Sequence, residues 1–98
     1  MNKPIIFDNE TKRIDFDLQR AHGYMDCERI IIYNLRKHMS NEVSTFDMER
    51  YLKKMLRYVE DKEVINRGNS VCANYKYAAG FINTIIATPC WHSWLKGS

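Results

Sequence analysis

The chain has 98 residues, 45% of them hydrophobic and 28% charged, and its 15 basic and 12 acidic residues give a formal charge of +3. This composition is typical of a globular protein and excludes disordered, collagen-like and low-complexity chains. We expect one small domain over residues 1–98, with a thin hydrophobic core.

The cysteines and the absence of long apolar segments predict a cytoplasmic protein with no membrane partner, and the pI argues against a dedicated nucleic-acid binder. The widely spaced Cys27, Cys72 and Cys90 do not form a disulfide framework, and we interpret them as reduced thiols. The first residues lack the apolar run of a signal peptide, and no window of the chain is apolar enough for a membrane span. The sequence pI of about 8.8 is below the range of dedicated nucleic-acid binders.

Residues 5–18 predict a β-hairpin. Ile14, Phe16 and Leu18 alternate with charged residues, which is the period of a half-buried strand. The polar stretch 8–12 is typical of a tight turn. Because a lone hairpin is marginally stable in water, its apolar face should pack on the rest of the domain.

Residues 18–39 predict a first helix. Its apolar stripe contains Leu18, Ala21, Met25, Ile32, Leu35 and Met39, with Ile31 beside it. Gly23 weakens the first turns by about 1 kcal/mol relative to alanine. The helix is therefore expected to begin properly only near Tyr24 or Asp26.

A second helix is predicted to begin at Ser44, which forms a capping box with Asp47, and to end near Gly68. Its apolar stripe contains Leu52, Met55, Leu56 and Val59. A third helix is predicted over residues 70–88, capped by Asn69 or Ser70 and ended by Pro89.

These elements predict an α+β fold, with an N-terminal β-hairpin packed on three α-helices. We expect the C-terminal helix to be central, because its only charge is Lys76. The alternative is an all-α fold in which residues 1–15 form an extended arm.

Two basic helical faces are candidate binding surfaces. Arg50, Lys53, Lys54 and Arg57 share one face of the second helix, and such a row can follow a phosphate backbone or an acidic protein. The ordinary interpretation is a solvated face neutralised by the pairs Asp47–Arg50, Glu49–Lys53 and Asp61–Arg57.

The first helix carries the second candidate surface, which contains Arg29, Tyr33, Arg36 and Lys37. Arginine and tyrosine together stack on bases or bind acidic grooves. The ordinary interpretation makes Tyr33 a residue at the core edge and pairs Asp26 with Arg29.

The C-terminal tail holds Trp91 and Trp94 and leaves two interpretations open. The tryptophans fold back and close the core, or they anchor a partner, since tryptophan is enriched at interface hot spots. A homodimer built by the tail would serve both interpretations.

No residue pattern predicts a metal, a cofactor or a catalytic centre. Cys90 and His92, combined with Cys72 and with Cys27 or His22, lack the paired spacing of a zinc site. No third group orients a Cys90–His92 pair, Asp8, Asp15 and Asp17 have no apolar pocket, and the glycines stand alone.

The sequence therefore predicts a small non-enzymatic binding protein that acts as an inhibitor, adaptor or regulator by docking onto a macromolecular partner. Small proteins of phages and other mobile elements often have this character. A partner protein is the first expectation, and DNA or RNA bound by the basic faces is the alternative. A homodimer through Ala79 and Gly80 of the third helix is a further alternative.

Overall fold

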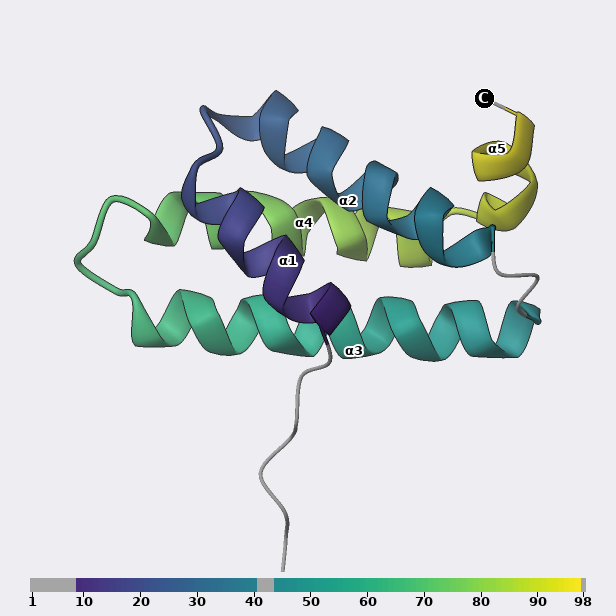
Figure 1. Cartoon of the computed structure of the whole chain (residues 1–98), viewed down its shortest axis with the longest axis horizontal. Coiled ribbons are helices and arrows are strands. Elements are labelled where there is room, and N and C mark those ends of the chain that lie inside the picture. The colour runs from purple at the N-terminus through teal and green to yellow at the C-terminus, as the bar shows by residue number, and fades with distance from the viewer. Residues whose placement is uncertain (1–8, 41–43, 98) are drawn as a thin grey trace, which may run out of the picture.

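The computed structural model describes residues 9–40 and 44–97, and this part of the chain forms an all-helical bundle (Figure 1). Its helices are α1 (Asn9–Gln19), α2 (Tyr24–Met39), α3 (Thr45–Ile65), α4 (Cys72–Ala87) and α5 (Trp91–Gly97). The long helices α3 and α4 pack along each other, α2 lies along α4, and α1 crosses in front of them (Figure 1). The described residues contain no strand, so the predicted α+β fold is wrong.

Helix α1 replaces the second strand of the predicted hairpin. Ile14 and Leu18 are both fully buried, whereas Phe16 between them is 56% exposed. Residues spaced by four lie on one face of a helix, so the pair satisfies a helical period as well as a strand period. The predicted strand at residues 5–8 lies outside the described residues, and the alternative of an extended arm to residue 15 is also wrong because α1 begins at Asn9.

Helix α2 begins at Tyr24, as expected from the position of Gly23. This glycine has a φ of 92°, in the left-handed region where it carries no steric penalty. The buried stripe of α2 contains Cys27, Ile31 and Leu35. Met25, which was predicted on the apolar stripe, is 67% exposed.

The predicted start of α3 is confirmed. The Asp47 backbone N–H donates to Ser44 Oγ over 3.1 Å, and the Ser44 hydroxyl donates to Asp47 Oδ2 over 3.0 Å. Such a cap satisfies a backbone donor that has no partner inside the helix. Gly68, with a φ of 92°, lies in the turn after α3, as predicted.

Helix α4 packs on α1, α2 and α3, and its buried residues are Tyr75, Ala78, Ala79, Phe81, Ile82 and Ile85. The predicted stop before Pro89 is confirmed, since the Thr88 cap has extended backbone. The predicted side-chain caps Asn69 and Ser70 are wrong: the N-cap is Val71, and no side chain caps the helix. One face of α4, including Lys76 and Gly80, is exposed, so the helix is less enclosed than predicted.

Helix α5 completes the core. Trp91 is only 5% exposed and Leu95 is 2% exposed. The turn before α5 places Cys90 at a φ of 57°, an uncommon conformation for a residue other than glycine. The tail therefore folds back on the bundle rather than extending from it.

Candidate functional site

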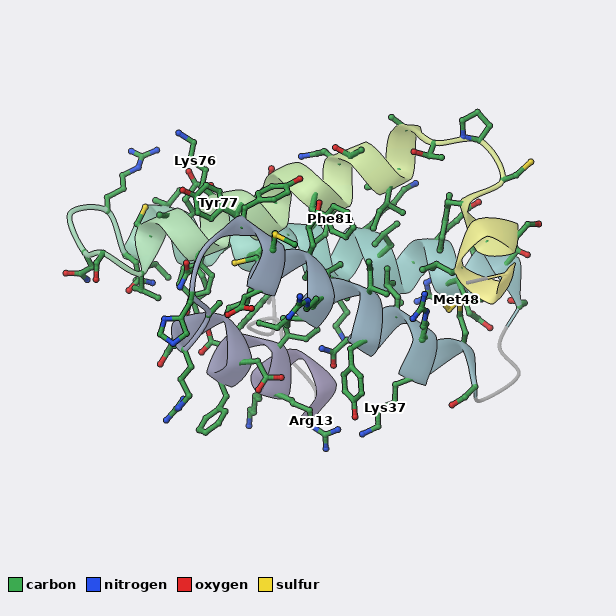
Figure 2. The ribbon with its side chains drawn as sticks, turned by 90° about the horizontal axis from the view of Figure 1, so that it is seen from above. Arg13, Lys37, Met48, Lys76, Tyr77 and Phe81 are labelled. Atoms are coloured by element: carbon green, nitrogen blue, oxygen red, sulfur yellow. The ribbon has the colours of Figure 1, made fainter. Side chains whose placement is uncertain are left out.

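The outer surfaces of α1 and α2 form one face that is rich in cations and aromatic rings. We call this surface the cationic face, and its residues are Arg13, Phe16, Arg20, Arg29, Tyr33, Arg36 and Lys37, all of which are exposed. Figure 2 shows Arg13 of α1 and Lys37 of α2 pointing to the same side of the molecule. The structure thus extends the predicted site on α2 with three residues of α1.

The bundle core explains why these side chains point outward. On α1, Ile14 and Leu18 face the other helices, and on α2 Ile31 and Leu35 do so. Helical geometry then directs the intervening positions to solvent. The α1 residues were missed because residues 13–18 were interpreted as a strand, which separated them from the helical surface.

Two aromatic rings on the cationic face are largely open to solvent. Phe16 is 56% exposed and Tyr33 is 58% exposed. The Arg20 guanidinium lies 3.6 Å from the centroid of the Phe16 ring, and Arg20 also donates to the Phe16 carbonyl over 3.1 Å. This cation–π contact holds a charge against an exposed ring.

Three acidic residues of α1 and α2, namely Asp15, Asp26 and Glu28, have hydrogen-bond partners that are not residues of the cationic face. Asp15 accepts a hydrogen bond from Tyr75 of α4. Asp26 accepts from the His22 backbone N–H over 2.8 Å, rather than serving Arg29 as predicted. Glu28 lies beside the Tyr24 hydroxyl, where partial burial and the hydrogen bond to Glu28 raise the pKa of Tyr24.

The four basic residues predicted to share one face of α3 differ in their exposure and in their contacts. Arg50, Lys53 and Arg57 are exposed and Lys54 is half-buried. Arg50 lies 5.8 Å from the centroid of the Phe46 ring. Lys53 instead lines a hollow between α3 and α4, together with Glu49, Leu52, Ile86 and Trp91. Asp47 is engaged with Ser44 rather than with Arg50.

Of the two tryptophans in the C-terminal tail, the structure describes the side chain of Trp91 but not that of Trp94. Trp91 is buried, and the His92 ring stacks on it with a centroid distance of 3.7 Å. Trp91 is therefore a core residue of this bundle, as the first of the two interpretations of the tail predicted. The Trp94 side chain lies outside the described part of the chain.

A polar cluster beneath α1 was not predicted from the sequence. Asp15 accepts from Tyr75 and from Gln19 Nε2, the latter over 3.2 Å, and its carboxylate lies 3.8 Å from Lys62 Nζ. Burial, reinforced by the Asp15 hydrogen bond, raises the pKa of Tyr75 to about 12. Burial and then the Asp15 charge also raise the pKa of Tyr58.

These tyrosines keep their protons at neutral pH, so the cluster provides hydrogen-bond donors rather than a general base. Its members come from α1, α3 and α4, and its role is to hold α1 on the bundle. Tyr75 is 56 positions from Gln19 and 60 positions from Asp15 in the sequence, so no local pattern could have revealed these contacts.

Within residues 9–40 and 44–97, no three His, Cys, Asp or Glu side chains gather to hold a metal ion. The helices of the same residues include none with the length and apolar character needed to cross a membrane.

Comparison with known proteins identifies no matching family model, no similar curated protein and no similar solved structure.

Proposed function

We propose that this chain is a non-enzymatic binding protein that docks its cationic face onto an acidic macromolecular partner. It would act as an inhibitor, adaptor or regulator, in a reducing cytoplasm where its cysteines stay as thiols. The observation that carries the proposal is the set of exposed cations and aromatic rings on α1 and α2. Phe16 and Tyr33 are more than half exposed, and Arg13, Arg20, Arg29, Arg36 and Lys37 are exposed on the same two helices.

The composition of the cationic face supports this proposal. Arginine and aromatic residues are enriched in binding interfaces and dominate their hot spots. The face is built on helices packed against a shared core, so the residues are presented without a folding step on binding. Trp91 of the tail is buried, which favours the exposed residues of α1 and α2 as the docking surface.

The double variant Arg13→Gln, Lys37→Gln tests the proposal. The tagged protein would be incubated with a lysate of its native host, and the captured species compared between wild type and variant. Lys76→Gln is the matched control, because Lys76 is exposed on α4 and points to the opposite side of the molecule (Figure 2). Circular dichroism would establish that all three proteins are folded.

We expect the double variant to lose the captured species and the Lys76→Gln control to keep it. Equal capture by the double variant and the control would contradict docking through this surface. Parallel capture after nuclease treatment separates a protein partner from a nucleic acid.

A further inference from the structure

The three most exposed aromatic rings among the described residues share one arrangement, in which a cation follows the ring by one helical turn, whereas Tyr24 and Tyr77 are followed at this spacing by Glu28 and Phe81. Phe16 precedes Arg20, Tyr33 precedes Lys37 and Phe46 precedes Arg50, always with a spacing of four. The first two pairs belong to the cationic face, and the third opens α3. Each of the three rings is more than half exposed.

In two of the three pairs the cation lies near its ring. The Arg20 guanidinium lies over the Phe16 ring and the Arg50 guanidinium lies near the Phe46 ring. Side chains four residues apart are neighbours on a helix surface, which explains why the geometry recurs. Each unit therefore offers a flat apolar surface and a positive charge within one helical turn.

A repeated unit of this kind fits a partner that is itself a repeat of flat rings and negative charges. Single-stranded nucleic acid has this chemistry, because its bases stack on aromatic side chains while its phosphates contact lysine and arginine. A duplex hides its bases and offers mainly phosphates. An acidic protein would match the cations but gives no reason for an open ring beside each one.

From this repetition we infer that the partner of the cationic face is single-stranded nucleic acid, an inference that rests on the proposed docking function. Phe16 and Tyr33 stack on bases, and Arg13, Arg20 and Lys37 contact the phosphates.

The test uses the full chain and three fluorescein-labelled 20-nucleotide probes, namely mixed-sequence single-stranded RNA, the matching single-stranded DNA and the DNA duplex. Fluorescence anisotropy would be followed from low to physiological salt. We expect tighter binding to the single strands than to the duplex. The two single-stranded arms distinguish RNA from DNA.

Two kinds of variant separate stacking from charge. Phe16→Leu and Tyr33→Leu keep an apolar residue but remove the ring, and each should weaken single-strand binding by roughly 5-fold or more, since a stacked base contributes at least about 1 kcal/mol. Lys37→Gln should lower the slope of log affinity against log salt by about 0.7, the value for one phosphate contact on a single strand. Tyr77→Leu and Lys76→Gln are the matched controls on α4 and should change affinity less than about 2-fold.

Three results would overturn the inference: no binding to any probe at low salt, equal binding to duplex and single strand, or full affinity in both ring variants. Competition with poly-glutamate adds a further arm, because displacement at similar concentration would show that the surface recognises charge alone. If no probe binds but a nuclease-resistant protein is captured and lost in the Arg13→Gln, Lys37→Gln variant, the docking function holds and only the nucleic-acid inference fails. If neither is found, both fail.

Discussion

The Tyr75 hydroxyl of α4 donates a hydrogen bond to the Asp15 carboxylate of α1, joining residues 60 positions apart. Tyr75 has no exposed surface, and Gln19 and Lys62 complete the surroundings of the carboxylate. A buried hydroxyl costs free energy unless it has a partner, so this contact ties α1 to the bundle. The other side of the same helix carries Arg13, Phe16 and Arg20.

Replacing Asp15 should therefore destabilise the fold. Asp15→Ala leaves the buried Tyr75 hydroxyl without its acceptor, and we expect the free energy of unfolding to fall by about 1–3 kcal/mol. Urea denaturation followed by circular dichroism measures this change. Asp61→Ala, at an exposed position of α3, is the control and should stay within about 0.5 kcal/mol of wild type. Equal effects of the two substitutions would contradict the assigned role.

Stability should decline at alkaline pH. The pKa of Tyr75 rises from 10.0 to about 12 in the folded protein, mainly through burial, so the folded state holds a proton that the unfolded state releases. The stabilisation is fully present below pH 10 and is lost as the pH rises toward 12. The raised pKa of Tyr58 acts in the same direction.

Urea midpoints between pH 8 and 11 measure this decline. Tyr75→Phe removes one titrating group and should flatten the dependence, even though its stability at pH 8 is lower. A midpoint that falls equally steeply in Tyr75→Phe would show that Tyr75 does not carry the effect.

Removing Trp91 should open the core. Its side chain is 5% exposed, and substituting a buried tryptophan by alanine typically costs about 3–5 kcal/mol. Thermal denaturation of Trp91→Ala should show a large fall in Tm. Ser93→Ala, at an exposed position of the same helix, is the control and should change Tm little.

The cysteines should differ in reactivity. Cys90 is exposed, whereas Cys27 is fully buried, and burial followed by the charge of Asp26 raises the pKa of the Cys27 thiol to about 11. Because the thiolate is the nucleophile, iodoacetamide should label Cys90 first and Cys27 only on unfolding. Peptide mass spectrometry over time measures the order. Early labelling of Cys27 in the folded protein would contradict its placement.

Two glycines should respond in opposite ways to alanine. An added Cβ at Gly80 meets no neighbouring atom within 4 Å, so Gly80→Ala inside α4 should raise the free energy of unfolding by roughly 0.5–1 kcal/mol. Gly68→Ala should lower it, because Gly68 has a φ of 92° that L-residues rarely adopt. Urea midpoints of both variants provide the comparison, and destabilisation by Gly80→Ala would contradict its open surroundings.

The local signals of the sequence predicted the three longer helices well. The Ser44 cap, the left-handed Gly68 and the stop before Pro89 each depend on neighbouring residues only, and all three are confirmed. The hairpin was wrong because Ile14, Phe16 and Leu18 satisfy two periods at once. What distinguishes them is long-range: Ile14 and Leu18 reach the core, and Asp15 reaches Tyr75.

Local helical spacing likewise predicted only the α2 residues of the candidate site. Arg29, Tyr33, Arg36 and Lys37 follow from helical spacing on α2, whereas Arg13, Phe16 and Arg20 join them only because α1 is a helix that packs on α2 with these residues exposed. Whether Trp91 lies inside or outside the core depends on the turn at Cys90, which no spacing rule specifies.

Under the proposed docking function, α1 would couple folding to binding through thermodynamic linkage, because one side packs on the bundle and the other carries residues of the cationic face. Any ligand of the cationic face favours the docked state of α1, which the Asp15–Tyr75 contact also favours. Saturation with that ligand would therefore slow hydrogen exchange at the α1 amides, while Asp15→Ala would weaken binding without touching the ligand. If the cationic face binds as proposed, the inner contact of this helix would therefore contribute to the affinity of its outer surface.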